Sequence, residues 1–137
     1  MRAFAAAAFA LALLALAFSG AAAARPPLEK NAPIVDKLFA AAVGDRIRKA
    51  CPSISARMLV VYREARALER RALDEGYSEA EIKAFVSNDA AKKRLEARAD
   101  AYLAERGATP GGQEAYCRVG RAEIAAKSPI GELLRSR

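Results

Sequence analysis

The sequence contains no histidine, and this absence excludes several classes of enzyme. Without an imidazole the chain cannot form a Ser-His-Asp or Cys-His catalytic arrangement, and it lacks the usual acid–base group of near-neutral pKa. Two cysteines without histidine also fall short of the four Cys or His ligands of a structural zinc site. The sequence has no CxxCH haem motif, no CxxC redox motif and no glycine-rich phosphate loop. We therefore expect no catalytic, cofactor-binding or metal-binding residues, and a protein that is not an enzyme.

A strand pattern is missing as well, because no segment alternates apolar and polar residues between turn signals. Apolar residues recur instead with helical spacing, which predicts an all-α fold. The expected architecture is a small bundle of about five helices clamped by one disulfide, with helices over 33–51, 53–75, 78–86, 89–106 and 113–127. Residues 128–135 are expected to form a last turn or short helix capped by Ser128.

Two of these helices carry informative local patterns. Ser78 and Glu81 have the spacing of a capping box, and Tyr77 and Ile82 occupy the positions of a hydrophobic staple. The second helix has a seam of apolar residues that we expect to face the core, made of Ile54, Met58, Val61, Ala65, Leu68 and Ala72.

The first 24 residues have the pattern of a cleavable secretory signal. Arg2 precedes an uncharged apolar run, and Ala22 and Ala24 offer a cleavage site before Arg25. The run is short for a membrane span, which needs roughly 20 residues; an uncleaved anchor is the alternative. We expect residues 1–24 to be the signal, 25–32 a polar lead-in and 33–137 a single helical domain. The alanine-rich composition is typical of a GC-rich bacterial genome, so the expected location is the periplasm.

Acidic residues are fewer than basic ones, and the formal net charge is +7. Removal of Arg2 with the signal leaves 22 Lys and Arg against 16 Asp and Glu, a net charge of +6. The basic residues are interleaved with acids rather than clustered, so the pattern does not indicate nucleic-acid binding. A solvated helix surface is the first interpretation, and a weak attraction to an anionic membrane or an acidic partner is the second.

The two cysteines form the strongest constellation. Cys51 ends the first expected helix and Cys117 lies in the fifth, 66 positions later. In an oxidising compartment two cysteines usually pair, so we expect an intramolecular disulfide; two free thiols and an intermolecular bridge are the alternatives. Gly120 lies one turn after Cys117 and would let the two helices approach closely.

Among the acids, Glu123 is the one without an obvious surface explanation. It has small and apolar neighbours and Arg121 two positions before it, yet its spacing to Lys127 also permits an exposed ion pair. A solvated face is therefore the first interpretation, and a partner contact by Tyr116, Arg121 and Glu123 is the second. General acid chemistry would require Glu123 to lie in an apolar pocket.

Two segments carry a resemblance to a known family: Cys-Pro-x-Ile-Ser at 51–55 and Tyr-Cys-x-x-Gly-Arg-x-Glu-Ile at 116–124. With them, nearly the whole mature chain resembles a family of small secreted alphaproteobacterial proteins known only as a domain of unknown function. The resemblance transfers no catalytic residues. It implies an accessory or assembly role on the periplasmic side of a respiratory membrane complex, the NADH–quinone oxidoreductase.

The leading functional hypothesis is thus a periplasmic helical protein that acts by protein–protein contact, peripheral to a membrane complex. The exposed helix faces and the segment 114–134 are the expected docking surface. A periplasmic stress chaperone is the second hypothesis, and a small-ligand binder or an enzyme is the third.

Overall fold

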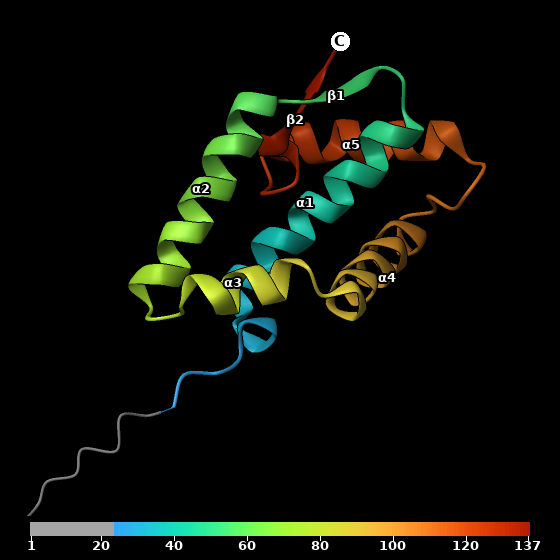
Figure 1. The fold of residues 1–137 in the computed structure, drawn as a ribbon. Helices are drawn as coiled ribbons and strands as arrows, with labels where there is room; N and C mark the ends of the chain where they lie inside the picture. Colours follow the sequence, from blue (N-terminus) through green and yellow to red (C-terminus); the bar gives the residue numbers. More distant parts are fainter. Residues whose placement is uncertain (1–23) are drawn as a thin grey trace, which may run out of the picture.

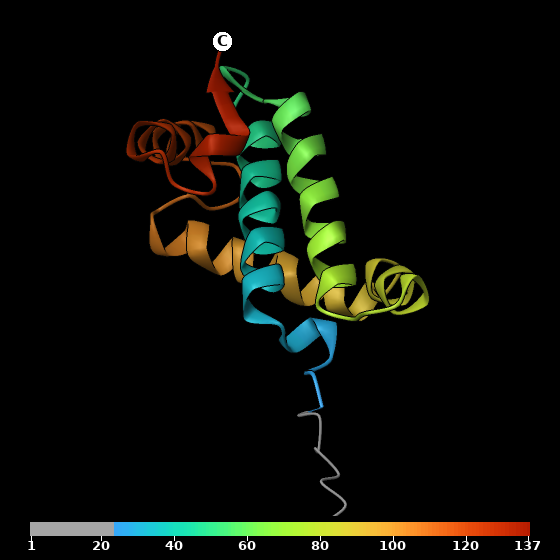
Figure 2. The same ribbon diagram turned by 90° about the vertical axis from the view of Figure 1, so that its left-hand side faces the viewer.

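Helix α1 is the element around which the rest of the chain is arranged (Figures 1 and 2). The computed structural model describes residues 24–137, so residues 1–23 of the expected secretory signal lie outside the described part of the chain. The described elements, in chain order, are η1 (Leu28–Lys30), α1 (Ala32–Ala50), β1 (Ile54–Ala56), α2 (Met58–Asp74), α3 (Glu79–Val86), α4 (Asp89–Glu105), α5 (Gln113–Ala126), η2 (Gly131–Leu133) and β2 (Leu134–Ser136). The predicted helical bundle is confirmed, and each long helix begins or ends within a few residues of its expected position.

Short polar side chains begin three of these helices. The Asn31 side chain accepts a hydrogen bond from the Ile34 amide at the start of α1, and Asn88 accepts one from the Ala91 amide at the start of α4. The predicted capping box of α3 is present: the Ser78 hydroxyl accepts from the Glu81 amide, and the Glu81 carboxylate accepts from the Ser78 amide. These bonds satisfy amides that have no partner within the helix.

The main core lies where α1, α4 and α5 meet. Val43 and Ile47 of α1 are fully buried there, together with Leu103 of α4. A second, smaller apolar cluster joins Leu28, Ile34, Ala72 and Tyr77 near the start of α1. Helix α2 contributes only Ala72 as a buried residue, so it covers α1 rather than completing the core.

A small β-sheet, which the sequence analysis did not predict, closes the end of the fold opposite η1 (Figures 1 and 2). Strands β1 and β2 pair antiparallel, with Ile54 opposite Ser136 and Ala56 opposite Leu134. The expectation of an all-helical chain is therefore wrong at residues 54–56 and 134–136. Each strand is three residues long, too short to show a period of two, and its partner lies at the other end of the chain.

The segment before α1 is held against α2 and α3. The Tyr77 hydroxyl donates to the Pro26 carbonyl at 2.6 Å, and Arg25 forms a two-pronged contact with the Glu81 carboxylate at 2.9 and 3.1 Å. The Asn31 amide donates to Glu75 at 2.6 Å. The expected polar lead-in is thus docked onto the helices. None of the helices in the described residues has the length and apolar character of a membrane span.

Candidate docking groove

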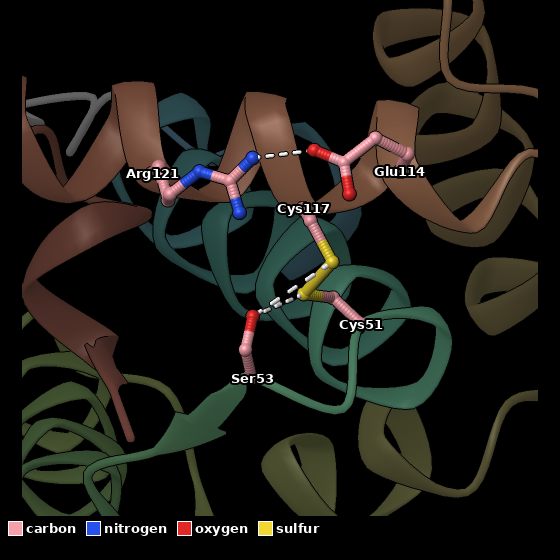
Figure 3. The surroundings of a disulfide bond; sticks show 5 residues. All are labelled: Cys51, Ser53, Glu114, Cys117 and Arg121. Atoms are coloured by element: carbon pink, nitrogen blue, oxygen red, sulfur yellow. Dashed lines mark hydrogen bonds and ion pairs between the residues drawn. A yellow bond between two sulfur atoms is a disulfide. The ribbon is translucent and has the colours of Figure 1, made fainter.

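A disulfide between Cys51 and Cys117 joins the end of α1 to the first half of α5 (Figure 3). Both cysteines are buried, and their Cα atoms are 5.1 Å apart. The Ser53 hydroxyl lies 3.2 Å from the Cys51 sulfur, at the start of the turn into β1. The predicted intramolecular disulfide is confirmed, and both alternatives, free thiols and an intermolecular bridge, are excluded for this structure. The bond fixes the position from which β1 departs.

Gly120 allows α5 to lie close to α1, as predicted. A Cβ atom at this position would lie 2.6 Å from Cγ2 of Ile47 and still closer to the Ile54 side chain. Real Cβ atoms do not approach other atoms so closely, so neither isoleucine could keep its place beside an alanine. The glycine is needed because two fully buried isoleucines fill the space against the helix backbone.

Glu123 is buried, so its interpretation as part of a solvated face is wrong. Its carboxylate accepts short hydrogen bonds from the Tyr102 hydroxyl of α4 and the Ser128 hydroxyl that follows α5. The expected ion pair with Lys127 does not form, because Lys127 adopts a left-handed backbone conformation that ends α5. Burial and the hydrogen bond to Glu123 raise the pKa of Tyr102. Glu123 therefore connects α4, α5 and the C-terminal segment.

Of the three candidate interaction residues, only Arg121 lies exposed. Its guanidinium pairs at 2.6 Å with Glu114, two turns back on α5, and not with Glu123 (Figure 3). Tyr116 is buried in the main core, so its ring is not available to a partner. The structure therefore does not bring Tyr116, Arg121 and Glu123 together into one surface. Much of the expected docking segment, 114–134, is core.

A groove between α1 and α2, which we call the α1–α2 groove, is the candidate docking site instead. Its closed end is a hollow of about 100 Å³ with mainly apolar walls. The Lys37 ammonium and the Glu64 carboxylate pair across it at 3.2 Å. Its floor is the C-terminal segment, which supplies Pro129 and Leu133. The remaining lining residues are Leu38, Ala40, Ala41, Val60, Val61, Ala65, Leu68 and Glu132.

The α1–α2 groove continues toward the β-sheet and becomes basic. Past Ala41 and Val61 it widens into a hollow of about 260 Å³ lined by Gly44, Met58 and Leu134, among others. Past Met58 it opens onto the strand pair, where Arg48, Arg135 and Arg137 line a shallow region of about 640 Å³. The groove thus has one apolar end and one basic end.

One carboxylate moderates the charge at the basic end. Partial burial disfavours ionisation of Asp45, but hydrogen bonds and charges from Lys49 and Arg48 outweigh it and lower the pKa of this carboxyl. Asp45 thereby neutralises part of the charge of Arg48, from which it is 2.5 Å away. In the part of the chain that the structure describes, Arg135 and Arg137 have no carboxylate within ion-pair distance.

The sequence does not indicate this site, because the helical periodicity of the α2 seam predicts that all of its residues face the core. Val61 and Leu68 do face α1, but Met58 is 67% exposed and Ile54 belongs to β1. One signal was available: Leu59 and Tyr62 are large apolar residues outside the seam, so α2 has more apolar surface than a single core-facing stripe can bury.

A family model described as "Family of unknown function (DUF5333)" matches residues 26–135. The match covers most of the chain, and the chain belongs to this family. No curated protein and no solved structure matches it significantly. The predicted membership in a family of unknown function is confirmed.

Proposed function

For this member of a family without an assigned activity, we propose a non-enzymatic docking protein of the periplasm that binds a protein partner in the α1–α2 groove. The observation that carries the proposal is the groove itself. Its lining is mainly apolar side chains of α1 and α2, and the Lys37 and Glu64 side chains that pair across it are about half exposed. Apolar concave surfaces of this kind are typical of sites that receive the apolar face of a partner's helix or strand.

The chemistry of the groove defines the segment that would fit it. The closed end accepts one or two apolar side chains, and the basic end favours carboxylates beside Arg135 and Arg137. We therefore propose an acidic segment with an apolar anchor, exposed by a subunit of a membrane complex. The choice of a respiratory complex as the first candidate rests on the family resemblance alone.

The test is a crosslinking experiment inside the groove. Ala41 is exposed and lines both apolar hollows, so a photoreactive side chain placed there should capture the partner in membranes. The same side chain at Ala101, an exposed position of α4, is the matched control. The captured peptide should contain both acidic and apolar residues. When the photoreactive side chain is placed at Ala65 instead, the added substitution Ala41→Gln should abolish capture, because it fills the groove with a polar side chain.

Equal capture at Ala41 and Ala101, or capture of peptides without acidic residues, would contradict the proposal. A different outcome would favour a stress chaperone, the second candidate, which is supported by the exposure of Met58, Leu59 and Tyr62 on α2. In that case the groove position would capture many unfolded proteins after heating, and the chain would suppress their aggregation. Ala41→Gln would then have little effect on capture or on the suppression of aggregation, because the binding surface would extend beyond the groove.

A further inference from the structure

The first two turns of α2 expose three large apolar side chains, which we call the α2 tip. Met58 is 67%, Leu59 83% and Tyr62 65% exposed. Met58 and Tyr62 are four residues apart, so they share one face of the helix, and Leu59 lies beside them. Met58 also lines the α1–α2 groove, but Leu59 and Tyr62 do not, so these two side chains form a projecting surface beside the groove and not part of a cleft.

Three basic residues lie near the α2 tip in the sequence or on the neighbouring strand. Arg57 precedes it, Arg63 lies one turn after Leu59, and Arg135 of β2 lies on the strand beside the start of α2. All three are exposed, and among the described residues none has a carboxylate within ion-pair distance. Arg57 donates to the Glu132 carbonyl at 3.1 Å, which holds it near the strand pair without neutralising its charge.

We propose that the α2 tip binds the surface of an anionic phospholipid bilayer. Projecting apolar side chains enter the boundary between headgroups and acyl chains, and neighbouring arginines contact the phosphates. Tyrosine is favoured at this depth because its ring is apolar and its hydroxyl is polar. A protein partner would need a cleft to receive these side chains, whereas a fluid bilayer accepts a projection directly. This proposal does not depend on the partner proposed for the α1–α2 groove.

The position of the tip gives the attachment an orientation. Figures 1 and 2 show the start of α2 beside the strand pair and the C-terminus, at the end of the molecule opposite η1. Attachment through the tip would therefore place the basic end of the groove next to the bilayer. A partner segment emerging from the membrane would meet that end first.

The experiment is co-sedimentation of the secreted, processed protein with lipid vesicles, after its N-terminus has been read by mass spectrometry. The protein should bind vesicles that contain phosphatidylglycerol and not vesicles of phosphatidylcholine alone, and high salt should weaken the binding. Leu59→Ser/Tyr62→Ser should weaken binding by roughly tenfold or more, because the apolar insertion is lost. Val86→Ser is the matched control, since Val86 is 74% exposed on α3, away from the tip.

A second pair of variants separates a local basic site from net charge. Arg63→Gln/Arg135→Gln should weaken binding about 25-fold, since each arginine near an anionic surface strengthens binding about fivefold. Lys92→Gln/Lys93→Gln removes the same charge from exposed positions of α4 and should have a much smaller effect. The proposal would be overturned if the arginine and lysine double variants lost vesicle binding equally, or if the protein did not bind anionic vesicles. It would also fail if the tip variants bound vesicles normally but lost the crosslink in the groove, because the tip would then belong to the protein interface.

Discussion

Reduction of the Cys51–Cys117 disulfide is expected to lower the free energy of unfolding by about 4 kcal/mol. The bond joins residues 66 positions apart, and the chain-entropy relation for a loop of that length gives about 4 kcal/mol. A domain of this size is typically stable by about 5–15 kcal/mol. Because α2 adds only one buried residue to the core, we expect the free energy of unfolding of this protein to lie at the lower end of that range. Little stability should therefore remain after reduction.

Urea unfolding followed by far-UV circular dichroism measures the effect on the oxidised and the reduced protein. Reduction is a cleaner perturbation than Cys51→Ala/Cys117→Ala, because it leaves every core atom in place. The dependence of stability on urea should also steepen, since an unfolded chain without the crosslink exposes more surface. A loss below about 1 kcal/mol with an unchanged urea dependence would refute the reasoning, because the bond would then not constrain the unfolded chain.

Two further predictions follow from the packing and the charges. Gly120→Ala should destabilise the oxidised protein by about 1–3 kcal/mol in the same urea assay, because the added methyl displaces Ile47; a neutral effect would contradict the close approach of α5 to α1. Hydrogen bonds from Arg71 and Asn31 lower the pKa of Glu75, and hydrogen bonds from Ser78 and Arg25 lower that of Glu81. Their stabilisation is therefore present above the ordinary carboxyl pKa of about 4.3 and lost as the pH falls through the lowered values. Melting temperature should drop below about pH 4, and less so in Glu75→Gln/Glu81→Gln; an equal drop in that variant would exclude these carboxylates as the cause.

The features that the sequence predicted correctly depend either on neighbouring residues or, for the disulfide, on the number of cysteines alone. The capping box of α3 needs only Ser78 and Glu81, three residues apart, and the backbone amides between them. The disulfide could be predicted without geometry, because a chain with two cysteines has only one intramolecular pairing available. Gly120 could be assigned to close packing once Cys117 was placed on α5.

The features that the sequence did not predict depend on distant residues. Ile54 fits the periodicity of α2 but pairs with Ser136, which no local pattern indicates. Glu123 has the spacing of an exposed ion pair with Lys127, but its partners Tyr102 and Ser128 come from α4 and from beyond the end of α5. In both cases the C-terminal segment supplies a partner, Ser136 for Ile54 and Ser128 for Glu123, so its position is part of the information that the local patterns lack.

That same segment gives the α1–α2 groove a firmly attached floor, whereas the wall formed by α2 is held more lightly. The floor residues Pro129 and Leu133 lie between two attachments, the Glu123–Ser128 hydrogen bond before them and the strand pair after them. The strand pair is in turn fixed by the disulfide, because β1 departs from Cys51. Helix α2 is attached more lightly: Arg57 bonds the C-terminal segment just before it begins, the half-exposed Glu64 pairs with Lys37 of α1, and only Ala72, near its end, is buried. The width of the groove therefore depends on α2, whose exposed tip and groove-facing side chains are the two surfaces proposed here for binding.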